Sequence, residues 1–169
     1  MDVSYINPFI QSTQRVFTTM LDLTVEIRKP HLSEALPRYD ISGIIGMSGD
    51  VVGSVVLSFP TSVARPIVGK FVGVDLDCES EDFSDAIGEL VNMISGAAKA
   101  QFEGKSVSIS CPSVIIGQGH QVARPSDTVC VSIPCDVYCG SFSIDVAIRP
   151  ESNSVPAAVT GAQERRTTA

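Results

Sequence analysis

The sequence has 169 residues, of which 44% are hydrophobic and 18% are charged, and its formal net charge at pH 7 is −7. This length and apolar content suit one globular domain and exclude an intrinsically disordered chain, which would be poorer in apolar residues and richer in charge. The acidic balance and the lack of a run of Lys or Arg argue against binding to nucleic acid or to an anionic membrane.

The first half of the chain predicts a helix, three strands and a short second helix. Residues 5–20 place apolar side chains near helical spacing, with Asn7 as the expected N-cap and Pro8 in the first turn. Three runs rich in β-branched residues then predict strands: 23–28, 39–47 and 51–59. The Ser-Gly-Asp sequence at 48–50 predicts a tight hairpin turn between the last two, and a short helix is expected over 62–72.

The second half repeats this order with a longer helix, expected over 80–102. The strands expected after it are 106–116, 128–134 and 138–148. Residues 117–127 have the composition of a loop. We interpret residues 1–149 as one domain and residues 150–169, which lack any periodicity, as a disordered tail.

The two hairpin turns resemble each other. Residues 50–54 (Asp-Val-Val-Gly-Ser) and 136–141 (Asp-Val-Tyr-Cys-Gly-Ser) differ by one inserted residue and one substitution. The alternative is that two turns share their chemistry by chance. With the repeated order of elements, we predict an α+β fold: an antiparallel sheet of about six strands and two long helices, built as two pseudo-duplicated helix–three-strand halves.

No segment reaches the roughly 20 consecutive apolar residues that a membrane-spanning helix needs. The N-terminal residues lack the basic start of a signal peptide, so we expect a cytoplasmic protein. The five cysteines include no CxxC pair, and His31 and His120 do not have the spacing of zinc ligands. We therefore expect no metal site and interpret the cysteines as small apolar residues in strands.

The long helix has two contrasting faces on a helical wheel. The apolar face contains Phe83, Ile87, Leu90, Ile94 and Ala98. The face roughly opposite carries a polar stripe of Asp85, Glu89, Asn92 and Gly96. Asn and Gly are poor helix formers, and no basic residue on the helix is placed to pair with Glu89, so the stripe is available to a partner. The alternative is a solvated helix face that happens to contain these residues.

The acidic residues at the start of the helix need no such function. Glu79, Glu81 and Asp82 suit the positive end of the helix dipole, and Ser80 is the expected N-cap.

Residues 85–96 (Asp-Ala-Ile-Gly-Glu-Leu-Val-Asn-Met-Ile-Ser-Gly) resemble the D/S-x3-E-x2-N signature of the CheC/CheX/FliY family. Members of this family are phosphatases of the phosphorylated response regulator CheY in bacterial chemotaxis. The start of the chain, at 7–10 and 16–20, resembles the CheX branch, and the resemblance covers about residues 1–149. The family also has a proline downstream of the Asn, and Pro112 follows Asn92 by 20 residues.

Some family members carry two active helices. In this chain the first helix has Asn7, Gln11 and Gln14 at the spacing of Asp85, Glu89 and Asn92, offset by 78 residues. We interpret the first helix, which lacks the carboxylates, as a degenerate counterpart of the second, and we expect one active site per chain.

The resemblance implies an enzyme that hydrolyses the aspartyl phosphate of a CheY-like response regulator. The regulator would supply the Mg²⁺ ion, the acceptor Asp and a Lys, so no cofactor of the chain's own is implied. Asn92 would orient the attacking water, and Glu89 would pair with the regulator's active-site Lys. Asp85 would lie at the rim, and Gly88 and Gly96 would let the partner approach closely.

The resemblance also implies a homodimer, which we expect to form through the apolar strands between 128 and 148. The alternative function is that of a non-catalytic signalling adaptor, which would bind a response regulator or a flagellar or receptor component. A small-molecule hydrolase lacks support, because no GxSxG motif or phosphate-binding glycine loop is present.

Overall fold

An antiparallel sheet carries three helices in the computed structural model, which describes residues 5–33, 38–123 and 128–151. The helices are α1 (Asn7–Leu21), α2 (Thr61–Val72) and α3 (Glu81–Lys99). The strands are β1 (Glu26–Ile27), β2 (His31–Leu32), β3 (Tyr39–Gly49), β4 (Val51–Phe59), β5 (Val107–Ile109), β6 (Ser113–His120), β7 (Val131–Val137) and β8 (Gly140–Pro150). Of the predicted tail, residues 152–169 lie outside the described residues.

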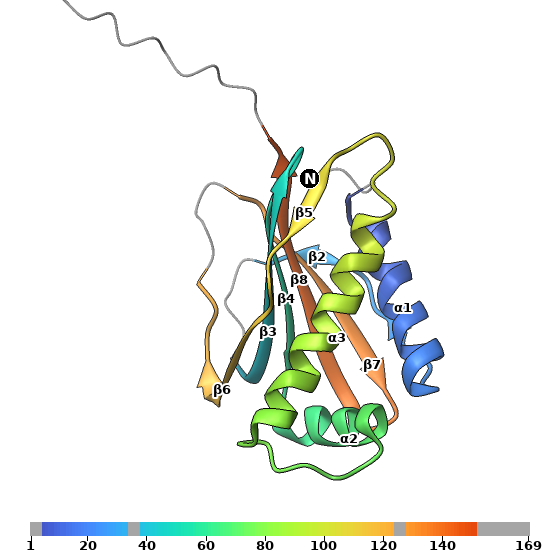
Figure 1. Ribbon diagram of the computed structural model, residues 1–169, viewed down its shortest axis with the longest axis vertical. Coiled ribbons are helices and arrows are strands. Elements are labelled where there is room, and N and C mark those ends of the chain that lie inside the picture. Colours follow the sequence, from blue (N-terminus) through green and yellow to red (C-terminus); the bar gives the residue numbers. More distant parts are fainter. Residues whose placement is uncertain (1–4, 34–37, 124–127, 152–169) are drawn as a thin grey trace, which may run out of the picture.

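The eight strands fill six positions in the sheet. One edge is shared by β1 and β2, which both pair with β7; β8, β4 and β3 follow, and β5 and β6 share the other edge beside β3. The helices α1 and α3 lie side by side over one face of this sheet, and α2 lies across one end of it (Figure 1). The predicted α+β fold, with an antiparallel sheet of about six strands and two long helices, is confirmed.

The order of the strands supports the predicted duplication. Exchanging α1, β1/β2, β3 and β4 for α3, β5/β6, β7 and β8 leaves the sheet order unchanged, and only α2 has no counterpart. The buried residues of α1 at positions 8, 9, 12, 13, 16 and 17 fall 78 residues before buried residues of α3. Gly53 and Gly140, from the two similar turns, both have positive φ angles, of 141° and 138°.

The core lies between the helices and the sheet. The five residues predicted for the apolar face of α3 are at most 1% exposed. From the other half, the ring of Phe17 in α1 stacks on Phe142 in β8 with a centroid distance of 5.0 Å. Each such side chain contributes about 1.5–3 kcal/mol by leaving water, so these contacts fix α1 and α3 on the sheet.

Several predicted boundaries are wrong for identifiable reasons. Asn7 is not the N-cap of α1, because Ile6 occupies that position and no side chain accepts a hydrogen bond there. The predicted strand 106–116 is two strands, β5 and β6, separated at Pro112. The second of these continues to His120 and so takes up the start of the predicted loop 117–127, of which residues 124–127 lie outside the described part.

The strands predicted to form an open edge are inside the sheet. The β7 strand pairs with β8 on one side and with β1 and β2 on the other, and β8 lies between β7 and β4. Their apolar side chains, such as Ile133 and Ile144, are fully buried in the core. The composition that predicted an uncovered strand is therefore explained by burial within one chain.

The cysteines are less uniform than predicted. None of the five forms a disulfide, and only Cys135 lies within a strand, where burial raises the pKa of its thiol to about 12. Among the described residues, no three His, Cys, Asp or Glu side chains are grouped as metal ligands would be. No helix in this part of the chain has the length and apolar character to cross a bilayer.

Candidate functional site

The start of α3 is fixed by side-chain and backbone hydrogen bonds. Ser80 is the N-cap, as predicted: its Oγ accepts a hydrogen bond from the N–H of Phe83 at 3.2 Å and donates to the carbonyl oxygen of Asp77 at 2.6 Å. Glu81 and Asp82 lie in the first turn, where the helix dipole favours negative charge. The register of α3 on the sheet, and with it the polar stripe, is set by this cap and by the buried apolar face.

The polar stripe of α3 faces solvent. Asp85 and Glu89 are exposed, and Asn92 and Gly96 are partly exposed. The Nδ2 group of Asn92 lies 3.5 Å from Oε2 of Glu89, at the outer limit of a hydrogen bond, so their mutual bond is weak. Neither the Arg28–Asp136 ion pair nor the Arg65–Asp75 ion pair involves the carboxylate of Asp85 or Glu89. A carboxylate and a carboxamide are thus presented together to an incoming molecule.

Pro112 reaches this stripe because the neighbouring edge of the sheet is interrupted. Ile109 pairs with Met47 and Ser113 with Ile44, so three residues, 110–112, lie opposite two residues of β3. Ser110 anchors the interruption to Gly46 of β3: the backbone N–H of Ser110 donates to the Gly46 carbonyl at 2.9 Å, and the Ser110 Oγ accepts from the Gly46 N–H at 2.9 Å.

Pro112 packs beside a glycine of α3. A Cβ atom on Gly88 would lie 3.3 Å from Cγ of Pro112 and 3.6 Å from Cγ2 of Val114. Gly88 is itself buried, and Pro112 of its own chain lies in the space that the missing side chain leaves. That Gly88 also lets a partner approach stays a prediction. Pro112 remains exposed and forms, with Gly88, a groove of about 460 Å³ whose lining is completed by Ser84, Asp85, Glu89 and Val114.

Gly96 has a different environment. Outside its own helical turns, the nearest atom to a Cβ placed on it is Cδ1 of Ile109, at 3.9 Å, so a methyl group there would meet no steric conflict with other elements of the chain. The partial exposure of Gly96 is compatible with the predicted close approach of a partner.

The degenerate counterpart predicted on α1 shares more than its spacing. Asn7, Gln11 and Gln14 are all exposed. The sheet edge beside β7 is interrupted in the same way as the other edge, since residues 28–30 lie opposite Ile133 and Pro134. Both interruptions end in a proline, Pro30 and Pro112. The two halves therefore differ at this surface chiefly in the carboxylates, which only α3 carries.

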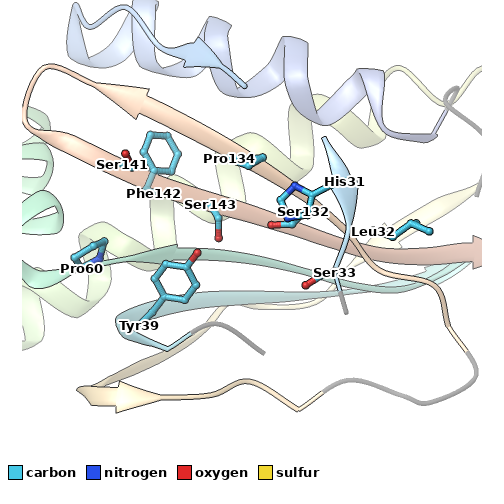
Figure 2. A pocket seen from close by; sticks show the side chains of 10 residues that line it. All are labelled: His31, Leu32, Ser33, Tyr39, Pro60, Ser132, Pro134, Ser141, Phe142 and Ser143. Carbon is cyan, nitrogen blue, oxygen red and sulfur yellow. The ribbon is translucent and has the colours of Figure 1, made fainter. Parts of the chain in front are cut away.

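A larger hollow than the groove beside Pro112 lies elsewhere on the described surface. It has a volume of about 630 Å³ and is lined by residues of β2, β7 and β8 together with Tyr39 and Pro60. Figure 2 shows the hydroxyl groups of Tyr39 and Ser143 pointing toward each other across it. No residue of the polar stripe lines it, so size alone does not indicate the reactive surface.

Sequence reasoning missed part of the groove wall. Ser84 and Val114, which line the groove beside Pro112, are not among the predicted site residues. The signal for the interruption is present in the sequence, because a proline cannot donate to a strand ladder and so argues against one continuous strand over 106–116.

Comparison with known proteins gives concordant results. A family model described as "Chemotaxis phosphatase CheX" matches residues 41–136, more than half of the chain. The CheY-P phosphatase CheX of Thermotoga maritima is 29% identical over 142 residues, which cover 82% of this chain and 90% of that protein. The segment that the family model matches includes α3 and Pro112.

Solved structures resemble the whole described fold. A CheC-like superfamily protein from Shewanella sp. PV-4 aligns with a TM-score of 0.82 and 31% identity, over 88% of this chain and 99% of that one. The CheX–CheY–BeF3–Mg²⁺ complex from Borrelia burgdorferi contains a chain that aligns with a TM-score of 0.73 and 23% identity, over 86% of this chain and 97% of that one. At that identity, the second likeness concerns the fold.

Proposed function

This chain belongs to the chemotaxis phosphatase CheX family, and on that premise we propose that it hydrolyses the aspartyl phosphate of a CheY-like response regulator. The observation that carries the proposal is the exposed carboxylate of Glu89, which lines the groove beside Pro112, with the partly exposed Asn92 three residues further along α3, all within the segment that the family model matches. The Thermotoga maritima relative is a CheY-P phosphatase, and the Borrelia burgdorferi relative binds CheY with BeF3 and Mg²⁺.

Asn92 is the proposed water-positioning residue. A carboxamide can donate and accept hydrogen bonds at once, so it can hold a water molecule in line with the scissile P–O bond. Phosphoryl transfer proceeds through a loose transition state and needs little covalent chemistry from the protein. Holding the water in near-attack geometry lowers the barrier by several kcal/mol, in the range known for well-oriented reactants.

Glu89 is the proposed docking residue. Its exposed carboxylate would pair with the Lys of the regulator's active site and thereby align α3 with the phosphoryl group. The Mg²⁺ ion and the acceptor Asp belong to the regulator in this scheme. Asp85, exposed one turn before Glu89, lies at the rim of the groove and would contact the regulator beside that site.

The proposal is tested by the lifetime of the phosphoryl group on a regulator. The stand-alone receiver domains of the same organism are phosphorylated with radiolabelled phosphate, and its release is followed with and without this protein. We expect faster release from at least one regulator. Binding without any acceleration would overturn the catalytic proposal and would instead support a non-catalytic adaptor.

We also propose a homodimer, now through a different strand from the one that the sequence predicts. Within the described residues, β6 pairs only with β3 and forms an edge of the sheet. Ile115 and Ile116 of β6 are each 38% exposed. An apolar edge strand can pair through its unpaired backbone groups with a strand of a second chain. Sedimentation at low micromolar concentration tests this: wild type should form a dimer that Ile115→Lys disrupts, and a monomeric wild type would overturn it.

A further inference from the structure

A second groove borders the polar stripe on the side away from Pro112. It is shallow, has a volume of about 390 Å³, and lies between the first half of α3 and the segment that joins α2 to α3. Its lining consists of Val72, Val74, Leu76, Asp82, Asp85, Ala86 and Glu89. The carboxylates of Asp85 and Glu89 line both grooves, so the second groove is continuous with the proposed catalytic surface.

The apolar side chains of this groove are held in an exposed position. Val72 is 39% exposed and Val74 is 57% exposed. Between them, Gly73 ends α2 in the left-handed conformation (φ 81°), and its N–H donates to the Gly69 carbonyl at 2.9 Å. An ion pair between Arg65 and Asp75 also braces the segment against α2. The exposure of the valines is therefore imposed by the local structure.

The brace is a two-bond contact between Arg65 and Asp75. Nε and Nη2 of Arg65 donate to the two carboxylate oxygens of Asp75 at 2.8 and 2.7 Å. This pairing occupies the guanidinium group of Arg65, and neither it nor the Arg28–Asp136 pair involves Asp82, Asp85 or Glu89. The groove thus combines an apolar floor with three carboxylates that have no cation of their own.

We propose that this groove is a second docking surface for the response regulator, which takes an aliphatic or aromatic side chain flanked by Lys or Arg. The inference rests on the proposed function, because the occupant is the regulator that docks on Glu89. Its chemistry follows from the groove: Val72 and Val74 bury an apolar side chain, and Asp82 and Asp85 attract the flanking cations. The groove then selects among regulators whose phosphorylation sites are alike.

The test compares two groove variants with two matched controls, using the full chain and a phosphorylated regulator. Val74→Ser removes an apolar side chain from the groove. Its control, Val129→Ser, makes the same change at a valine that is 52% exposed and does not line the groove. Asp82→Asn removes one negative charge from the groove. Its control, Glu81→Gln, removes one negative charge at an exposed position in the same helical turn, outside the groove. KM and kcat for phosphoryl release are measured at low and high salt.

We expect Val74→Ser to raise KM about tenfold at either salt concentration, since it removes burial of an apolar group. Asp82→Asn should raise KM about threefold at low salt and much less at high salt, because screening weakens charge pairing. Both controls should match wild type, and kcat should stay unchanged in all four variants.

The outcomes separate this inference from the proposed function. If wild type releases phosphate and both groove variants keep the KM of wild type, the docking surface is wrong and the catalytic proposal stands. If the controls shift KM as much as the groove variants, the effect is not specific and the inference is also overturned. If wild type accelerates release from no regulator, the proposed function fails and the inference fails with it.

Discussion

Pro112 packs against Gly88: its Cγ lies 3.3 Å from the position that a Cβ atom on the glycine would take. This contact joins the interrupted sheet edge to α3. The contact depends on both residues. The proline interrupts the sheet edge between β5 and β6, and the glycine leaves the space that the proline occupies. The exposed carboxylates of Asp85 and Glu89 flank the contact. The groove beside the polar stripe is therefore shaped from within the chain.

Replacing Gly88 by a branched residue should disturb both stability and function. The side chain of Gly88→Val cannot fit beneath Pro112, and overpacking of this kind costs about 1–3 kcal/mol of unfolding free energy. Displacement of Pro112 should also raise KM for the phosphorylated regulator. Urea denaturation and phosphoryl-release kinetics measure the two effects, and a variant with wild-type values in both would show that the contact is unimportant.

Gly96→Ala should move stability and activity in opposite directions. Outside its own helical turns, no atom lies nearer than 3.9 Å to the added Cβ. Alanine is favoured over glycine in a helix by about 1 kcal/mol, so the free energy of unfolding should rise. If the regulator approaches α3 closely at Gly96, the methyl group should raise KM. A more stable variant with unchanged KM would place the regulator's contact elsewhere on α3.

Glu89→Gln should weaken docking while leaving the water-positioning group in place. The substitution keeps the shape of the side chain and removes the charge that would pair with the regulator's Lys, so KM should rise about tenfold at low salt. The difference from wild type should shrink at high salt. Glu103→Gln, an exposed change after the end of α3, is the matched control. Equal KM values for Glu89→Gln and the control would contradict the docking role.

Asp40 connects three elements and gives the fold an acid-sensitive contact. Its carboxylate accepts hydrogen bonds from the N–H of Thr61 at 3.0 Å, from Oγ1 of Thr61 at 3.2 Å and from the N–H of Gly119 at 3.3 Å. These donors, the Thr61 N–H above all, hold the pKa of Asp40 below its usual value of 3.8. They join the start of β3 to the start of α2 and to β6.

Because the folded-state pKa is depressed, the stabilisation by Asp40 is present above the unfolded-state pKa and is lost as the pH falls through the lower folded-state pKa. Asp40→Asn should therefore lower the free energy of unfolding by about 1 kcal/mol at pH 7. The gap between variant and wild type should narrow near pH 3. Urea denaturation at several pH values measures it, and a gap that does not change with pH would refute the charge-dependent role.

Local patterns in the sequence are sufficient to predict α3 and its buried face. They do not show which strands pair with each other in the sheet. Helical periodicity predicts the buried face of α3, because Phe83 and Ile94 must share one side of any helix that contains them. The prediction of an open edge at residues 128–148 is wrong because β1 and β2 cover β7, and their short sequences carry too few residues to indicate a strand partner. Tertiary pairing decides such edges.

For the candidate site, too, local spacing predicts the helix face, and tertiary packing decides the rest. Spacing alone places Asp85, Glu89 and Asn92 on one face, and the structure presents all three at least partly exposed. The environment of Gly88 was not predictable from spacing, because the residue above it, Pro112, belongs to a distant strand. Whether a helical glycine admits a partner or a neighbouring strand depends on that packing.

The central claim, that Asn92 positions the attacking water, is tested most directly by kcat and KM of Asn92→Ala for a phosphorylated regulator. Gln14→Ala is the matched control, because Gln14 is an exposed carboxamide at the corresponding position of α1. We predict that Asn92→Ala lowers kcat by about a hundredfold or more with KM little changed, and that Gln14→Ala behaves as wild type. A near-wild-type kcat for Asn92→Ala would contradict the account.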